Sequence, residues 1–433
     1  MMHRSDASQT VALRQTTLFL LMAFAIASGL LIRSSFPFSL AIPVIVYLLL
    51  GQHPADVATR SRVSADRLRV SAGEEVTVTA TVSLDAPVAF VRVEQALPVG
   101  VEHVSGDLYF AGRHDAGHDI ELTYTIRCPR GVHLIRSPTV TVSNATLLRE
   151  TSVQSPDRVR IHSVPRVHGP RRVSIRPPQV NLFPGIIPSR IAGSGTQFFD
   201  LREYRPGDSL RRVSRKSQLS SGRLARLLVT EYEEERAVDV CIILDVRRSV
   251  YEHTDTALFD AACNGAAGLA ERFSSDGNRV SLLMYGGALQ WAAPGYGKRR
   301  KEAILDQLAE ARLQEHGAFQ DLSRLPLHLL RSGTQLILVS PLHIDDTKDL
   351  HTLHARGFRV FVLRPNSLES SRRQLPDDAY TELAYRLVKL EHSRLSEELE
   401  RHGILVVDWR DGLSLAECFS VNRARFDAWS RHR

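Results

Sequence analysis

Two uncharged apolar runs at the start of the chain constrain its fold more than any other feature. Residues 15–32 and 34–55 hold no charged side chain, and only Arg33 separates the two runs. A helix needs about 20 apolar residues to cross a bilayer, so each run is near the required length. The pattern predicts a tight transmembrane helical hairpin within residues 1–58, with Pro37 and Pro43 starting or kinking its second helix.

Arginines flank both ends of this hairpin. Arg4 and Arg14 precede it, and four more follow at positions 60, 62, 67 and 69. Because basic residues collect on the cytoplasmic side, we expect a two-helix protein of the cell membrane with both termini and its soluble domains in the cytoplasm. The alternative is a signal peptide ending at Ala25-Ile26-Ala27, but the second apolar run follows directly and disfavours it.

Composition narrows the functional classes. The chain has 433 residues, enough for two or three domains, and Lys plus Arg (55) exceeds Asp plus Glu (48) by seven. This modest surplus suits a protein facing anionic lipid and does not favour nucleic-acid binding. The cysteines form no CxxC pair, which predicts buried thiols in a reducing compartment rather than a zinc site or disulfide framework. They are Cys128, Cys241, Cys263 and Cys418.

Residues 59–155 show the period of β-strands. Apolar residues alternate with threonines over 75–82, and similar alternation recurs over 120–126 and at Val140 and Val142. Gly and Pro punctuate these runs as turns. We therefore expect an all-β, immunoglobulin-like sandwich here.

The pattern changes twice after the sandwich. Residues 156–235 are rich in proline and then in arginine, which indicates a linker that carries a basic stretch at 211–226. From 236 to 433, buried strands alternate with amphipathic helices, which predicts a doubly wound α/β domain. The run 238–245 ends in Asp245, and ligands of such sheets bind beyond the carboxyl ends of the strands.

One segment resembles a known family. Residues 193–208 read Gly-Ser-Gly-Thr-Gln-Phe-Phe-Asp-Leu-Arg-Glu-Tyr-Arg-Pro-Gly-Asp, and basic residues and an acidic run follow before the strand that ends at Asp245. With the hairpin and the sandwich, this segment resembles the membrane-anchored proteins of the domain of unknown function 58 family. The matching residues are Leu201, Arg202, Tyr204, Pro206, Gly207, Asp208, Arg211, Lys216 and Glu235.

The resemblance implies a fold and a role. Such proteins carry a von Willebrand factor A-like domain, are linked with MoxR-type AAA+ ATPases, and are thought to act as adaptors or assembly factors. The resemblance thus implies a non-enzymatic, membrane-anchored interaction protein whose A-like domain docks a protein partner, such as a MoxR-type AAA+ ATPase. We expect the 201–208 segment to buttress the domain junction or contact the partner, with Arg202 and Asp208 as an ion pair.

The chain departs from the metal site of such domains. A metal-ion-dependent adhesion site has Asp-x-Ser-x-Ser after its first strand and holds a hard divalent cation, whereas this chain reads Asp245-Val-Arg-Arg-Ser249. Asp245 and Ser249 remain as ligands of a degenerate site. A guanidinium at Arg247 would repel Mg²⁺ and pair with Asp245, so we expect no cofactor and a docking role for Arg247.

Two alternatives stay open. The first is a metal-dependent membrane-bound hydrolase that uses Asp245, Asp345 and Asp346, because the last two follow the strand expected at 335–339. Against it, acidic residues often cap the N-terminus of a helix. The second is a scaffold that binds anionic lipid through the arginines of 211–226.

Overall fold

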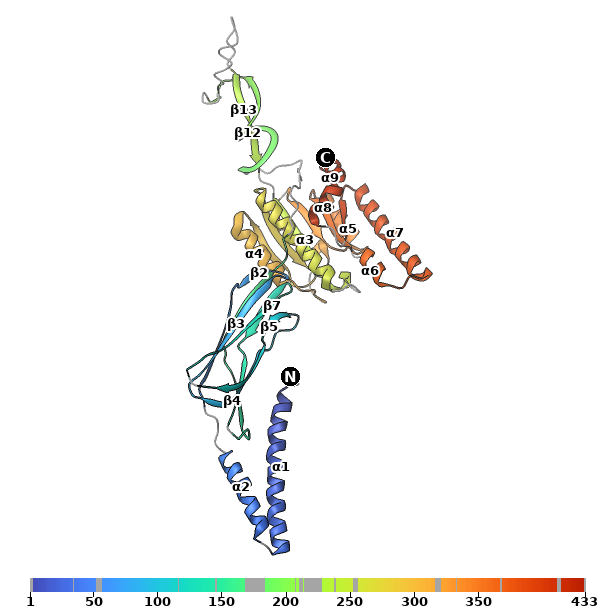
Figure 1. Cartoon of the computed structure of the whole chain (residues 1–433). Helices are drawn as coiled ribbons and strands as arrows, with labels where there is room; N and C mark the ends of the chain where they lie inside the picture. Colours follow the sequence, from blue (N-terminus) through green and yellow to red (C-terminus); the bar gives the residue numbers. More distant parts are fainter. Residues whose placement is uncertain are drawn as a thin grey trace. The chain divides into compact units, whose positions relative to one another are not determined.

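The computed structural model divides into two compact units, Met1–Ser163 and Val164–Arg433 (Figure 1). Each unit is described by itself. The residues that the structure describes are 3–33, 35–51, 57–115, 117–144, 146–167, 184–206, 208–209, 213, 228–236, 239–251, 256–315, 321–331, 333–366, 368–410 and 414–431.

The first unit begins with a helix pair, α1 (His3–Ile32) and α2 (Phe36–Leu50). Within α1, the 20 residues Leu13–Ile32 are long and apolar enough to cross a membrane. The second helix is also apolar but has only 15 residues. At 1.5 Å per residue it is about 22 Å long, shorter than the roughly 30 Å hydrocarbon core. Among the described residues, one helix is therefore long and apolar enough to cross a membrane, where the sequence predicted two.

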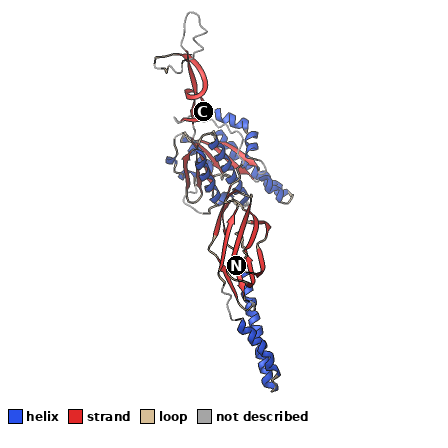
Figure 2. Cartoon of the chain, turned by 60° about the vertical axis from the view of Figure 1, so that its left-hand side comes forward, coloured by secondary structure: helices blue, strands red, loops and turns tan. Residues whose placement is uncertain are grey.

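Antiparallel strands make up the rest of the first unit (Figure 2). They form three sheets with the orders β1-β3-β7-β5, β10-β9-β4-β6 and β2-β11-β8. The strands are β1 (Thr59–Ala65), β2 (Arg69–Ser71), β3 (Glu75–Leu84), β4 (Val88–Glu94), β5 (Glu102–Gly106), β6 (Tyr109–His114), β7 (Ile120–Arg127), β8 (Gly131–Arg136), β9 (Thr139–Ser143), β10 (Glu150–Gln154) and β11 (Arg158–Val164).

Alternating side chains build the core of these sheets. Along β3 every second residue is buried, from Val76 to Leu84, and the threonines between them face outward. β7 pairs with β3 in antiparallel register and buries Ile120, Leu122 and Tyr124 in the same way. The period-2 pattern read from the sequence therefore corresponds to the two faces of these strands. Strand pairing continues past residue 155, because β11 pairs with β8.

The second unit opens with a two-stranded antiparallel ribbon, β12 (Pro184–Glu203) and β13 (Leu228–Arg236). A six-stranded sheet follows, with the order β16-β15-β14-β17-β18-β19. All its pairs are parallel except the edge pair of β15 and β16. Its strands are β14 (Asp239–Asp245), β15 (Arg279–Tyr285), β16 (Gln290–Gly295), β17 (Gln335–Val339), β18 (Arg359–Asn366) and β19 (Leu405–Arg410).

Helices cover both faces of the sheet. One core joins α3, α4, α8 and α9 to one face, and a second core joins α5 and α7 to the other. The helices are α3 (Thr256–Ser275), α4 (Gly297–Glu310), α5 (Asp346–Ala355), α6 (Leu368–Gln374), α7 (Ala379–Arg401), α8 (Leu415–Val421) and α9 (Arg423–Arg431), and the short 3₁₀ helices are η3 (Arg248–Tyr251), η4 (Leu322–Arg324) and η5 (Leu327–Leu329).

The fold class expected from the sequence is confirmed at the level of its layers: a helix pair, antiparallel sheets, and a mixed α/β sheet. The alternation of buried strands and helices predicted over 236–433 is present, and the strand expected at 335–339 is β17. The sequence analysis missed the edge strand β16 and helix α4, which starts at Gly297.

Candidate functional site

The candidate site lies where the sheet reverses its strand order. β14 has β15 on one side and β17 on the other, and the next strand along the chain after each lies farther out. In doubly wound sheets the loops after two such central strands diverge and leave a crevice at their carboxyl ends. Asp245 is the last residue of β14, and Ser340 directly follows β17. These side chains therefore meet at the position where such folds bind ligands.

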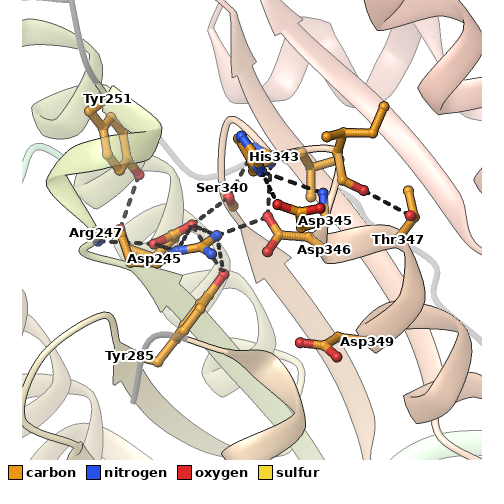
Figure 3. A network of polar contacts seen from close by, with 12 residues as sticks. Asp245, Arg247, Tyr251, Tyr285, Ser340, His343, Asp345, Asp346, Thr347 and Asp349 are labelled. Atoms are coloured by element: carbon orange, nitrogen blue, oxygen red, sulfur yellow. Dashed lines mark hydrogen bonds and ion pairs between the residues drawn. The ribbon is translucent and has the colours of Figure 1, made fainter. Parts of the chain in front are cut away.

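Asp245 is fully buried, at 0% exposure, and is the centre of a polar network (Figure 3). The guanidinium of Arg247 donates from Nε to Oδ1 at 3.0 Å and from Nη2 to Oδ2 at 2.7 Å. The hydroxyls of Ser340 and Tyr285 donate to Oδ2 at 2.8 and 3.0 Å. The expected ion pair between Asp245 and Arg247 is present, and neighbouring strands complete it.

A second carboxylate shares the same guanidinium. Nη2 of Arg247 also donates to Oδ2 of Asp346 at 2.8 Å, and the backbone N–H of His343 donates to that oxygen at 2.8 Å. Asp346 is 3% exposed and lies in the first turn of α5, where the helix dipole favours negative charge. Arg247 therefore bridges two carboxylates, one from the end of β14 and one from the start of α5, the helix that follows β17.

Electrostatics fix the protonation states of Arg247 and Tyr285 in this network. Burial lowers the pKa of Arg247, but the hydrogen bonds and charge of Asp245 outweigh it and raise the pKa above the usual range for arginine. Burial raises the pKa of Tyr285 well above its ordinary value, and the nearby charge of Asp245 adds to this. At neutral pH the guanidinium is therefore charged and the phenol is a hydrogen-bond donor.

The residues at this site do not fit a divalent cation. The Nη2 atom of Arg247 lies within 2.8 Å of both carboxylates, where it holds the place and the charge that a metal ion would need. Ser249, the remaining hydroxyl of the degenerate motif, is exposed in η3. Among the described residues, no group of three or more His, Cys, Asp or Glu side chains could hold a metal ion.

The carboxylates proposed for a hydrolase do not converge. Asp346 binds the Arg247 guanidinium, whereas the side chain of Asp345 is exposed and lies 3.2 Å from Nδ1 of His343. The two neighbouring carboxylates thus have different partners, Arg247 for Asp346 and His343 for Asp345 (Figure 3). Only Asp346 joins Asp245 in the buried network.

The family-like segment forms a separate network at the end of β12. Arg202 makes a two-pronged ion pair with Asp208, with both N–O distances at 2.7 Å, and a further ion pair with Glu231 of β13. The backbone N–H of Arg205 also donates to Asp208. Arg202 lowers the pKa of Asp208 to about 2 through its hydrogen bonds. The ion pair predicted between Arg202 and Asp208 is therefore confirmed, and it ties the segment to the ribbon.

The other residues of this segment are less informative. Leu201 is exposed at the end of β12, and Tyr204 and Pro206 follow the strand. Glu235 lies in β13, paired with Pro188 of β12. Gly207, Arg211 and Lys216 lie outside the described residues, as do the other arginines of 211–226.

Sequence reasoning missed several partners of Asp245. The hydroxyls of Tyr285 and Ser340 donate to its carboxylate, and the hydroxyl of Tyr251 in η3 donates to its backbone carbonyl. The sequence analysis names none of these three residues. Their positions could have identified two of them, because Tyr285 and Ser340 stand at or just after the carboxyl ends of the strands adjacent to β14.

Comparisons with solved structures found partial likenesses. Proximal thread matrix protein 1 from the mussel byssus is 13% identical over 44% of this chain and 46% of its own, with a TM-score of 0.27. The same protein with a zinc-occupied MIDAS motif is 14% identical over 30% of this chain and 38% of its own, with a TM-score of 0.23. A FixG-related protein from Vibrio parahaemolyticus is 10% identical over 24% of this chain and 95% of its own, with a TM-score of 0.17.

Sequence comparison finds a family match within the second unit. No curated protein matches the chain significantly. The family described as protein of unknown function DUF58 matches residues 200–385. This range starts at the Arg202 network, includes Asp245, Arg247 and Asp346, and ends within α7. Residues 200–385 of this chain are therefore a DUF58 family domain.

Proposed function

We propose that this protein is a membrane-anchored, non-enzymatic docking protein, and that the face at the carboxyl ends of β14 and β17 binds a protein partner without a metal ion. One observation carries the proposal. The guanidinium of Arg247 binds both buried carboxylates of the site, Asp245 and Asp346. A permanent cation in this place supplies the charge that a divalent ion supplies in a metal-ion-dependent adhesion site.

Chemistry at the site favours docking over catalysis. Arginine neither gives up nor takes a proton at physiological pH, and Asp245 and Asp346 are held by it as hydrogen-bond acceptors. Neither carboxylate is then available as a general acid or base. Beside them, Ile344 is 58% exposed although it is a large apolar residue, and His343 is exposed next to it. An exposed apolar side chain at a crevice suits a protein contact.

The architecture supports finer proposals for both soluble parts. The sheet order, with one antiparallel edge strand and an acidic residue at the end of the central strand β14, supports a von Willebrand factor A-like domain. The three antiparallel sheets share one apolar core, which supports an immunoglobulin-like sandwich. In this proposal, α1 anchors the chain in the cell membrane, α2 completes a hairpin, and the flanking arginines place both termini in the cytoplasm.

The proposed partner is an AAA+ ATPase of the MoxR type, because the family that this chain resembles is linked with such ATPases. The test is crosslinked affinity purification of the full-length chain from its native membrane, followed by mass spectrometry. We expect an AAA+ ATPase to be enriched with the wild type and to fall at least tenfold with Ile344→Asp. The matched control is Val421→Asp, which changes another exposed apolar residue, at the end of α8.

Two results would contradict this proposal. Equal enrichment with Ile344→Asp and with the wild type would show that the partner does not bind the face at the carboxyl ends of β14 and β17. Hydrolysis that depends on Mg²⁺ or Mn²⁺ and disappears in Asp345→Ala would show a metal-dependent enzyme instead.

A further inference from the structure

Helix α7 carries an apolar seam that the described residues of its own domain leave exposed. The spacing between the four seam residues is three, four and three, which is the a and d pattern of a two-stranded coiled coil. All four are large and solvent-exposed: Tyr380 (85%), Leu383 (57%), Leu387 (58%) and Leu390 (58%). Single exposed leucines are ordinary, but four in register along one helix form a continuous stripe.

This seam is distinct from the face that holds α7 on the domain. Leu395 and Leu399 are buried in the core beneath the second half of the helix. On another side, α6 contacts the first half through the hydrogen bond from Tyr385 to Glu369 and the ion pair between Arg372 and Glu382. At about 100° per residue, the seam points away from both of these contacts. Figure 1 shows α7 along the outer edge of the α/β sheet, with α6 beside it.

Charges beside the seam indicate what covers it. If Tyr380 and Leu387 are a positions, and Leu383 and Leu390 are d positions, then Arg386 is a g position and Glu391 is the next e position. In a parallel pair, a g residue faces the e residue five positions later on the partner helix. We propose that a second copy of this chain binds along the seam as a parallel helix pair, with Arg386 of each copy facing Glu391 of the other.

The same charges disfavour other occupants. An antiparallel pair centred between Leu383 and Leu387 would place Arg386 of one copy beside Arg386 of the other, and these like charges repel. A membrane surface is a poor match as well, because α7 has five glutamates against four Lys and Arg residues. An anionic leaflet attracts helices with a basic excess.

The seam is short, so the pairing needs a high local concentration. Two heptads form a small interface, and copies held in the same membrane meet at a higher effective concentration than copies free in solution. In this respect the inference rests on the proposed membrane anchor. It does not involve the docking face at β14 and β17, and its test uses different residues.

The test is disulfide crosslinking of the full-length chain in native membranes. The native cysteines are all buried, so Tyr380→Cys supplies the reactive thiol. A parallel pair places the two introduced thiols side by side, and we expect a covalent dimer on mild oxidation. Val421→Cys is the control for random collision, because Val421 is exposed in α8 and outside the seam. We expect its dimer yield to be at least fivefold lower.

Charge exchange tests the pairing mode. In the Tyr380→Cys background, Arg386→Glu should lower the dimer yield about fivefold, and adding Glu391→Arg should restore it. A dimer that forms only between Tyr380→Cys and Leu390→Cys chains would overturn the parallel arrangement. A dimer yield equal to that of Val421→Cys, or crosslinking only to a different protein, would overturn self-association. Membrane fractionation of the same samples reports separately whether the anchor holds.

Discussion

Arg247 is the residue on which the buried polar network at the end of β14 depends most. Its guanidinium has buried carboxylates on two sides, and removing one partner of a buried ion pair commonly costs about 3–5 kcal/mol. Arg247→Ser restores the Asp-x-Ser-x-Ser pattern but leaves Asp245 and Asp346 without their cation. We expect this variant to unfold at a lower temperature than the wild type.

The response of the melting temperature to Mg²⁺ should differ between Arg247→Ser and the wild type. In Arg247→Ser, millimolar Mg²⁺ should raise the melting temperature, because the two carboxylates then lack a counter-charge. In the wild type it should have no effect. Arg248→Ser is the matched control, since the side chain of Arg248 makes an exposed ion pair with Glu315, and its loss should cost less than about 1 kcal/mol. Stabilisation of the wild type by Mg²⁺ would contradict the assignment of Arg247 as the resident cation.

His392 should make the stability of the folded state depend on pH. Burial lowers the pKa of His392 below 6.5, and the charge of the buried Arg364 lowers it further. The folded state therefore binds fewer protons than the unfolded state once the pH falls below about 6.5. The contribution of His392 to stability is complete above that pH and is lost as the pH falls through its folded pKa.

The check is the melting temperature measured between pH 8 and pH 5. We expect the wild type to lose more stability than His392→Gln over this interval, because glutamine does not titrate. His328→Gln, which changes an exposed histidine, should follow the wild type. Identical pH profiles of the wild type and His392→Gln would rule out a coupling between protonation of His392 and folding.

At the scale of elements, α3 contacts the sheet through a glycine. A Cβ atom on Gly265 would lie 2.6 Å from Cζ3 of Trp409 in β19, closer than real contacts allow. Alanine gains about 1 kcal/mol of helix propensity over glycine, whereas overpacking a core costs about 1–3 kcal/mol. We therefore expect Gly265→Ala to lower the free energy of unfolding, although alanine is the better helix former.

A double-mutant cycle checks this reason. Trp409→Phe removes the part of the ring that would clash, so Gly265→Ala should be less damaging in that background. Urea unfolding of the four proteins gives the coupling energy. Equal effects of Gly265→Ala in both backgrounds would mean that its cost does not come from Trp409.

Whole-molecule behaviour follows from the two compact units. Cys128 belongs to the first unit, and Cys241 and Cys418 belong to the second. Burial raises the pKa of Cys128 to about 11 and the pKa of the other two to about 12. We expect none of these thiols to react with a maleimide at neutral pH in the native protein.

Pulse labelling along a urea gradient then reports each unit separately. If the units unfold independently, Cys128 becomes reactive at a different urea concentration from Cys241 and Cys418. Val421→Cys, exposed in α8, should react at once and confirms that the reagent is active. One common midpoint for all the buried thiols would show that the two units unfold as a single cooperative body.

Local pattern was enough to predict most of the elements. The alternation in β3 and β7 and the continuous apolar run in β14 have the periods of half-buried and fully buried strands, so their assignments needed no tertiary information. The leucines of α7 have the spacing of an amphipathic helix, but that spacing does not show that the first half of the helix stays exposed. The edge strand β16 was missed because only pairing with β15 makes it a strand.

The sequence by itself determined the apolar N-terminal run, the period of the strands and helices, and the pairing of Asp245 with Arg247, because these depend on neighbours in the chain. Only the tertiary structure decided which distant residues join that pair. Asp346 and Tyr285 are 99 and 38 residues from Arg247, and the parallel order of β15, β14 and β17 brings them to one edge. Strand order is set by the packing of the whole sheet, which no local pattern contains.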